Sequence, residues 1–242
     1  MKSTHFAPCA LFLFALSSSS NCAAQESKPA IHISSPSGFL TVEIGKNILS
    51  IAYQKIGLEA HFVEMPAKRS LVEANKGALD GEVNRVEAIG ASFPNLIMVP
   101  TPINYVEQVL YSSLHSGPIT DCSQLTNYKV GIIRGVKHAT TCAEHAKEVV
   151  VFNNVTDLMK VLNLGRLDFA IAARVTGYPF ERDPHYANIK PLTPALKRTE
   201  LHHYLHKSNA DLVGKLDRVF IDMTNSGELE KIRIKTIEDS LQ

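Results

Sequence analysis

The chain has 242 residues, of which 45% are hydrophobic and 20% are charged, and its formal net charge at pH 7 is +1. It contains no tryptophan and no run of basic residues. This balance argues against the basic surface that nucleic-acid-binding proteins carry, so we expect a small-molecule partner and no nucleic acid. The length allows one large domain or two lobes.

The N-terminal segment has the order of a secretory signal peptide. A basic start precedes the apolar run 6–16, and small residues lead to Ala24. We expect cleavage there, with residues 1–24 removed and the rest exported to the periplasm. The apolar run is shorter than the roughly 20 residues that a membrane-spanning helix needs. A lipoprotein attached through Cys22 is disfavoured, because residues 19–21 lack the usual leucine and small-residue pattern.

In chain order, the apolar residues predict alternating strands and helices. Strands are expected over residues 30–34, 58–63, 80–86, 95–99, 106–112, 129–133, 149–152, 169–173 and 199–207. Helices are expected over residues 39–56, 66–76, 157–164, 211–224 and 228–241, with a further helix that follows residues 134–138 and ends at 146. Thr156 is expected to cap the helix over 157–164. This alternation predicts an α/β fold.

Two cysteines, Cys122 and Cys142, remain after removal of the signal peptide. In an oxidising compartment they predict one disulfide, and two unpaired buried thiols are the alternative. A redox function is not expected, since the sequence has no C-x-x-C spacing in this region.

A repeated pattern predicts two lobes of similar plan. The segment Gly77-Ala-Leu-Asp80 matches Gly165-Arg-Leu-Asp168, and each glycine follows a predicted helix while each aspartate precedes an apolar strand. Glycine suits the left-handed position that ends a helix. We interpret both aspartates as structural caps and not as catalytic acids.

Several motifs, in this order, resemble the type II periplasmic solute-binding proteins of solute-binding protein family 3, the amino-acid ABC transporter substrate-binding type. They are Pro66-Ala-Lys-Arg-Ser-Leu71, Asn75-Lys-Gly-Ala-Leu-Asp-Gly-Glu82, Pro100-Thr-Pro102, Val130-Gly-Ile-Ile-Arg-Gly135, Gly165-Arg-Leu-Asp168 and Asn225-Ser-Gly-Glu-Leu229. The resemblance implies a two-lobed fold with two crossing strands as a hinge. It places lobe one in residues 25–110 and 199–242 and lobe two in 111–198. It also implies a monomeric binding protein without enzymatic activity or cofactor, and a membrane permease or receptor as its partner.

The sequence departs from that family at two places. The usual Thr-x-x-Arg that holds the α-carboxylate of an amino acid is missing after Asp80, and Arg85 is the nearest substitute. The place of the ammonium-binding aspartate holds Ala173, beside Arg174. Arginines on both sides of one cleft favour a carboxylate or another anion.

The residues expected to contact the solute are Arg69, Glu82, Arg85, Tyr105, Arg134, Gly135, His138, Arg174 and Tyr178. Arg85 and Arg174 end predicted strands, where open α/β sheets bind ligands. The segment 134–138 joins a strand to a helix N-terminus, which presents free backbone N–H groups to an anion. The alternatives are that Arg85 pairs with Glu82 or Glu87, that Arg69 lies on a solvated helix face, and that both tyrosines serve packing.

Other functions stay open as alternatives. A sensory module of the same fold would report the solute to a membrane receptor. An enzyme on the same scaffold, such as a periplasmic dehydratase, would need Glu82 or His138 as its general acid or base. A metal site is not expected, because His202 and His206 would be ~13 Å apart on a strand, and a metal at His138, Cys142 and His145 would compete with the disulfide.

Overall fold

The computed structural model describes residue 1 and residues 29–242. The predicted signal peptide, its cleavage after Ala24 and the disfavoured lipid attachment at Cys22 therefore lie outside the described residues. Among the residues that are described, no helix is long and apolar enough to cross a membrane.

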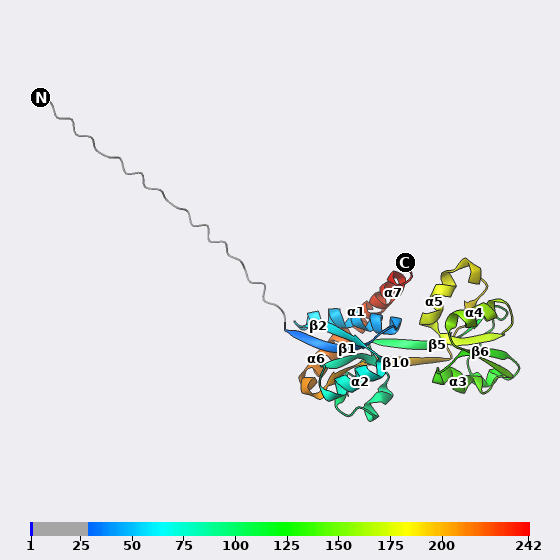
Figure 1. Ribbon diagram of the computed structural model, residues 1–242, viewed down its shortest axis with the longest axis horizontal. Coiled ribbons are helices and arrows are strands. Elements are labelled where there is room, and N and C mark those ends of the chain that lie inside the picture. The colour runs from blue at the N-terminus through cyan, green and yellow to red at the C-terminus, as the bar shows by residue number, and fades with distance from the viewer. Residues whose placement is uncertain (2–28) are drawn as a thin grey trace.

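Lobe one begins with three parallel strands and the helices that connect them. The strands β1 (Ala30–Pro36), β2 (Glu59–Met65) and β3 (Gly81–Arg85) lie in the order β2-β1-β3. Between and after them come α1 (Leu40–Lys55), α2 (Ala67–Lys76), η1 (Glu87–Ala91) and the short strand β4 (Leu96–Met98). The chain returns at its end to add η4 (Lys207–Asn209), α6 (Ala210–Asn225) and α7 (Glu228–Asp239). Figure 1 shows these elements gathered in the lobe nearer the N-terminus.

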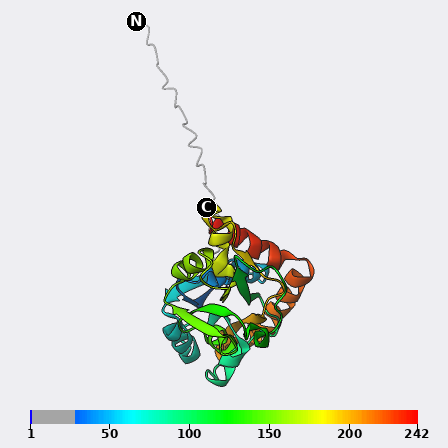
Figure 2. The same cartoon turned by 90° about the vertical axis from the view of Figure 1, so that its right-hand side faces the viewer.

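Lobe two has three parallel strands of its own, arranged on a similar plan. It contains η2 (Cys122–Leu125), β6 (Lys129–Ile133), α3 (Lys137–Ala143), β7 (Glu148–Phe152), α4 (Val155–Asn163), β8 (Phe169–Ala173), α5 (Arg174–Arg182), η3 (Pro184–Tyr186) and β9 (Lys190–Pro191). Strand β6 lies between β7 and β8 and is parallel to both. Figure 2 shows this lobe facing the viewer.

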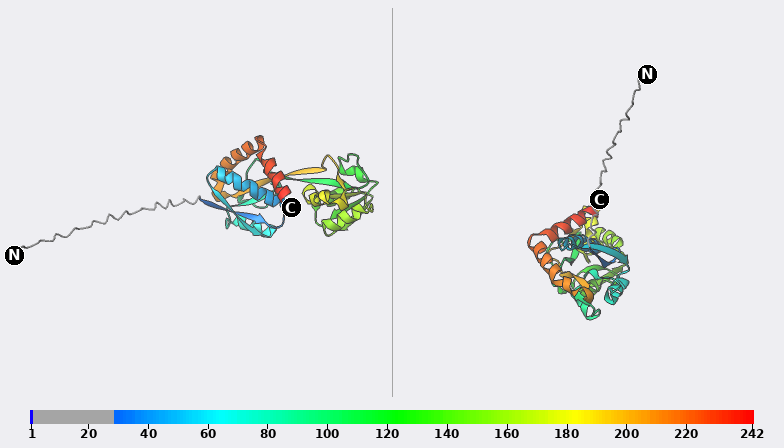
Figure 3. Two further views of the ribbon diagram at one scale, coloured as in Figure 1. Left: turned by 90° about the horizontal axis from the view of Figure 1, so that it is seen from above. Right: turned by 90° about the vertical axis from the view of Figure 1, so that its left-hand side faces the viewer.

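Two long antiparallel strands cross between the lobes. They are β5 (Asn104–Ser112) and β10 (Lys197–His206), and their register pairs Gln108 with Lys197 and Asn104 with Leu201. Strand β10 also pairs with β3 of lobe one, while β5 also pairs with β8 of lobe two, so one sheet runs through the whole molecule. The view from above in Figure 3 shows the lobes side by side, joined by these strands. The expected two-lobed α/β fold with two crossing strands is confirmed.

Each lobe has its own hydrophobic core. In lobe one, α1 packs with α6 and α7 over the sheet, and Ile48, Leu49 and Phe220 are fully or almost fully buried there. In lobe two, separate clusters lie around α3 and α4. Burying one such side chain contributes roughly 1.5–3 kcal/mol. The cores therefore fix each lobe internally, while the link between lobes depends on the crossing strands and a few contacts beside them.

The repeated Gly-x-Leu-Asp pattern has the same structure in both lobes. The carboxylate Oδ2 of Asp80 accepts a hydrogen bond from the backbone N–H of His32, and that of Asp168 accepts one from the N–H of Lys129, each at 2.8 Å. In both cases the aspartate secures the start of a neighbouring parallel strand, β1 or β6. The preceding glycine in each lobe has a positive φ, 77° and 66°. These bonds confirm the structural interpretation of the two aspartates.

Two local predictions differ from the structure. The helix cap is Asn154 and not Thr156, because the Asn154 side chain accepts the N–H of Asp157 at 2.9 Å and α4 already begins at Val155. Helix α5 is not predicted, since its sequence contains Gly177 and Pro179, which usually interrupt helices. The glycine is required there because the Tyr111 hydroxyl occupies the space that a Cβ would take.

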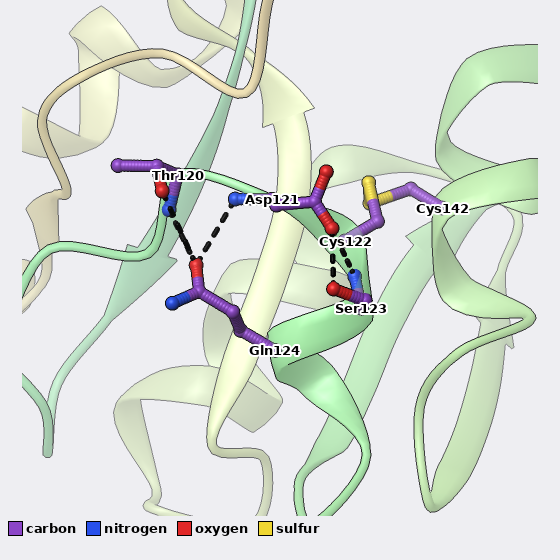
Figure 4. Close-up of a disulfide and its surroundings, with 6 residues drawn as sticks. All are labelled: Thr120, Asp121, Cys122, Ser123, Gln124 and Cys142. Atoms are coloured by element: carbon purple, nitrogen blue, oxygen red, sulfur yellow. Dashed lines mark hydrogen bonds between the residues drawn. A yellow bond between two sulfur atoms is a disulfide. The ribbon is translucent and has the colours of Figure 1, made fainter.

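The predicted disulfide is present between Cys122 of η2 and Cys142 of α3 (Figure 4). Their Cα atoms are 5.1 Å apart, within the usual range for a disulfide. Next to it, the Asp121 carboxylate accepts the backbone N–H of Ser123 at 2.8 Å, which caps the first turn of η2. The bridge thus joins η2, which precedes strand β6 in the sequence, to α3, which follows it.

Candidate functional site

A pocket of about 240 Å³ lies where β1 and β3 end, on the side of lobe one that meets the crossing strands. It is lined by Pro36, Phe39, Thr41, Val42, Asn84, Arg85, Val86, Ile89, Val106 and Leu201. The carboxyl ends of parallel strands are where α/β sheets bind ligands. Phe39, at the start of α1, is 53% exposed, which is unusual for so large an apolar side chain. The pocket therefore offers an aromatic surface and a guanidinium beside it.

Arg85 and Glu82 form a bonded pair beneath this pocket. The Arg85 Nε donates to a Glu82 carboxylate oxygen at 2.8 Å, and its Nη2 donates to the Ala67 carbonyl at 2.8 Å. The Glu82 side chain has no exposed surface, and the hydroxyls of Ser34 and Ser70 donate to its other oxygen. Burial raises the pKa of Glu82, while the charge of Arg85 and these hydrogen bonds oppose the rise. The Arg85 side chain keeps 20% exposure.

Two asparagines hold the first turn of α1 against the strands. The Asn84 Nδ2 donates to the Thr41 carbonyl at 3.0 Å, and the Asn104 Nδ2 donates to the same carbonyl at 2.8 Å. They connect β3 and β5 to the helix that carries Phe39, and so they fix the shape of the pocket. The sequence prediction does not include these residues. The signal that could have found Asn84 is its place next to Arg85, at the end of a strand.

Arg174, at the start of α5, and Tyr105, on the crossing strand β5, both contact other residues of the protein. The Arg174 Nε donates to the Glu107 carboxylate at 3.1 Å, and Arg198 approaches the same carboxylate at 3.9 Å. The Tyr105 ring lies between the guanidinium carbons of Arg198 and Arg233, which are 3.6 and 3.8 Å from its centroid. Two guanidinium groups at such short distances cannot share one face of the Tyr105 ring, so both faces of the ring are occupied.

Helix α5 brings lobe two into contact with lobe one. It begins with Arg174, and its Tyr178 packs against the lobe-one core. Burial raises the pKa of Tyr178, and the nearby charges of Arg233 and Arg174 oppose that rise. Tyr178 therefore lies in the same neighbourhood as Arg174 and Tyr105.

The remaining candidates lie elsewhere. The Arg134 Nε donates to the Asn153 side chain at 3.1 Å, and Gly135 forms the turn before α3 with φ 82°. The His138 Nε2 is buried and has no hydrogen-bond partner among the described residues. Burial, helped by the charge of Lys197, lowers the pKa of His138. Arg69 is 70% exposed on the outer face of α2 and lies near Glu73.

The predicted residues thus fall into separate groups. Glu82 and Arg85 are together at the lobe-one pocket, and Arg174, Tyr105 and Tyr178 share the region of α5 and β5. No residue between 111 and 196 lines the lobe-one pocket, so lobe two does not contribute to it in this arrangement of the lobes. Across residues 29–242, no group of three His, Cys, Asp or Glu side chains is placed to hold a metal ion.

Solved structures match the chain over most of its length, although no protein-family model and no curated protein sequence matches it. The L-cystine solute receptor of Neisseria gonorrhoeae, in an unliganded open conformation, matches with a TM-score of 0.70 and 14% identity, over 87% of this chain and 93% of that one. The second substrate-binding domain of a putative amino-acid ABC transporter from Streptococcus pneumoniae matches with a TM-score of 0.67 and 15% identity, over 86% of this chain and 99% of that one.

A third similar structure belongs to a receptor. It is a histidine kinase sensor domain with similarity to periplasmic binding proteins, with a TM-score of 0.55 and 17% identity, over 87% of this chain and 97% of that chain. These identities are too low to transfer a ligand or a partner. Together with the sheet order and the crossing strands, they establish the architecture: the chain has the two-lobed α/β fold of type II periplasmic-binding proteins.

Proposed function

We propose that this protein is an extracytoplasmic solute-binding protein that captures a small polar solute, anionic or amino-acid-like, for an ABC-type transporter. The observation that carries the proposal is the pocket at the ends of β1 and β3, which lies on one of two lobes joined by crossing strands. The predicted signal peptide supports export, and the Cys122–Cys142 disulfide suits an oxidising compartment.

Arg85 is the proposed anchor for the anionic group of the solute. Its bonds to Glu82 and Ala67 use Nε and Nη2, which leaves donors on Nη1 for a carboxylate. Because Glu82 is buried, its function in this proposal is to position the guanidinium and not to touch the solute. Phe39 would cover the apolar part of the solute.

Lobe two supplies the second set of contacts when the lobes close. In the proposal these come from Arg174, Arg134, His138 and the backbone N–H groups after Gly135, which follow the ends of β8 and β6. A solute that touches both lobes only in the closed form shifts the equilibrium toward closure by its difference in affinity. Arg174 would exchange its bond to Glu107 for the solute in this step.

A sensory function is the second candidate, supported by the similarity to a histidine kinase sensor domain. Both functions need the same solute-binding cleft and differ in the membrane partner. Genes for a permease and an ATPase next to the gene for this protein would favour transport. Enzymatic function has weaker support, since the Glu82 carboxylate is fully buried and bonded to Ser34, Ser70 and Arg85.

A thermal-shift screen of carboxylates, amino acids, short peptides and sugars tests the proposal. A solute at 100 times its dissociation constant adds roughly 2.7 kcal/mol of stability, which raises the melting temperature clearly. Phe39→Ala and Arg174→Ala should weaken the binding of the solute so found. The exposed Arg218→Ala on α6 is the matched control and should bind normally. Full affinity in folded Phe39→Ala and Arg174→Ala proteins would show that the site is misplaced.

A further inference from the structure

A second cavity, of about 250 Å³, lies between the first turn of α7 and the crossing strands. Its wall includes Tyr105, Arg198, Glu200, Glu230 and Arg233. It shares no lining residue with the lobe-one pocket. Tyr105 lines this cavity, and the next residue of β5, Val106, lines the lobe-one pocket. Because successive side chains of a strand point to opposite faces, the two spaces lie on opposite faces of the crossing strands.

Arg233 is the most unusual residue of this cavity. The residue is only 4% exposed. In the part of the chain that the structure describes, its guanidinium nevertheless forms no ion pair with a carboxylate. Its Nη1 donates to the Asn104 side chain and to the Tyr105 carbonyl, both neutral acceptors. Within residues 29–242, no protein group accepts a hydrogen bond from its Nε or Nη2, and neither nitrogen is among the enclosed side-chain atoms that lack a partner, so both keep contact with solvent. These donors are therefore free to bind a ligand that enters the cavity.

Unpaired negative charge lies across the same cavity. Neither Glu200 nor Glu230 forms an ion pair with a lysine or arginine among the described residues. The only side-chain group near the Glu230 carboxylate in the hydrogen bonds described is the Tyr105 hydroxyl, at 3.4 Å. The cavity wall therefore holds a guanidinium that stacks on Tyr105 and forms no ion pair among the described residues, together with two exposed carboxylates that also form none.

The first turn of α7 adds backbone donors to the positive side. Gly227 lines the cavity and is the N-cap of this twelve-residue helix, but it has no side chain to satisfy the free N–H groups. Such groups attract a carboxylate. They lie on the same helix as Arg233, about one turn earlier in the sequence.

We propose that this cavity is a second small-molecule site, which binds a small zwitterion of the amino-acid class. The carboxylate of the ligand lies against Arg233 and the first turn of α7, and its ammonium group lies against Glu230 and Glu200. A ligand with only one of these charges leaves the other side of the cavity unpaired, so both charges are needed. Because Tyr105, Arg198 and Glu200 belong to the crossing strands, the ligand contacts the hinge directly.

NMR of the ¹⁵N-labelled mature chain tests the site locally, with glycine, acetate and methylammonium as probes. Glycine should shift the backbone amides of Gly227 and Leu229 and the Nε–H of Arg233. Acetate and methylammonium should bind at least ten-fold more weakly. Glu230→Gln replaces an exposed carboxylate at constant size and should weaken glycine binding at this site about ten-fold or more.

Two controls separate this site from the lobe-one pocket. Arg218→Gln on α6 changes an exposed charge outside the cavity, and Phe39→Ala changes only the lobe-one pocket, so both should leave the glycine shifts at Gly227 and Arg233 unchanged. Three results would each overturn the proposal: no shift at these groups with 100 times more glycine than protein, equal binding of acetate and glycine, or an unchanged affinity in Glu230→Gln.

Discussion

The Nε of Arg85 lies 2.8 Å from a carboxylate oxygen of Glu82, whose side chain is completely buried. The sequence predicts both residues as solute contacts, with a pair between Arg85 and Glu82 as the alternative. The structure gives them different environments, since Glu82 is enclosed by Ser34 and Ser70 while Arg85 reaches the pocket. The pair therefore links the stability of lobe one to the shape of its pocket.

Removal of the positive member of this pair should destabilise the protein. Arg85→Gln leaves the Glu82 carboxylate buried without its cation, and breaking a buried pair costs roughly 3–5 kcal/mol. Urea unfolding at pH 7.5 measures the loss. The double variant Glu82→Gln, Arg85→Gln should recover much of it, because no buried charge remains. If the single and double variants lose equal stability, the pair does not have this function.

The same variant should depend on pH in a defined direction. The folded pKa of Glu82 is raised, so its stabilising contribution is fully present below the unfolded pKa of about 4.5 and is lost as pH rises through the folded pKa. Loss of the opposing charge of Arg85 raises that pKa further. The stability deficit of Arg85→Gln should therefore be larger at pH 7.5 than at pH 4.5. A deficit that is constant between these pH values would contradict this account.

His203 should make lobe one sensitive to acid. Its ring is fully buried, its Nδ1 donates to the Glu82 carbonyl at 2.8 Å, and its Nε2 accepts the Tyr53 hydroxyl at 2.8 Å. Burial lowers its pKa to about 4. Since this folded pKa is below the unfolded value of 6.5, stability should be lost as pH falls from 6.5 toward 4, by about 3 kcal/mol in total.

Unfolding free energies of the wild type and His203→Gln, measured between pH 7.5 and 4.5, test this sensitivity. Glutamine keeps a donor and an acceptor but does not titrate, so the acid-dependent loss should be smaller in the variant. His185→Gln is the control, because the His185 side chain is 90% exposed. The same acid-dependent loss in all three proteins would exclude His203 as its source.

The disulfide leads to a prediction about thiols and stability. In the chain without residues 1–24, which contain Cys9 and Cys22, thiol labelling after denaturation without reduction should find no free cysteine. The bridge closes a loop with a sequence separation of 20, and Cys142→Ser should lower the unfolding free energy by roughly 3 kcal/mol. Reactive thiols in unreduced protein, or equal stability of Cys142→Ser, would show that the bridge does not form in solution.

Gly177 should resist substitution because of its neighbour in lobe two. A Cβ at this position would meet the Tyr111 ring and hydroxyl, so Gly177→Ala should destabilise the protein by roughly 1–3 kcal/mol. Gly214 of α6 has open space around it, and Gly214→Ala should be neutral or stabilise by up to about 1 kcal/mol. Thermal unfolding of the two variants compares them directly. A tolerated Gly177→Ala would mean that α5 can move away from β5.

The elements that could be predicted from the sequence depend on local chemistry. The glycines at 77 and 165 and the aspartates after them recur at fixed spacing, and their backbone conformation and capping bonds follow from that spacing. Helix α5 could not be found in this way. Its Gly177 is required by Tyr111, a residue far away in the sequence, so the local pattern indicates a break where the tertiary structure needs a helix.

The site was harder to predict than the fold because its contacts join distant elements. Glu82 receives hydrogen bonds from β1, α2 and β3, and this enclosure is visible only once the three are assembled. The sequence prediction does not include Arg233 and Glu107 among the candidate residues. A usable signal exists for each, since Glu107 is a charged residue in a predicted crossing strand and Arg233 is one on the buried face of a helix. Arg174 is predicted at the end of a strand but is the first residue of α5, and its bond to Glu107 depends on the register of β5 and β8.

Closure of the two lobes on a solute is the central claim, and small-angle X-ray scattering with the solute from the thermal-shift screen tests it most directly. The radius of gyration should fall when the wild-type protein is saturated. It should fall less in Arg174→Ala, because this variant lacks a proposed lobe-two contact, while Arg218→Ala should behave as wild type. Saturation that leaves the scattering of the wild-type protein unchanged would contradict closure, and with it the proposed way in which the two lobes capture the solute.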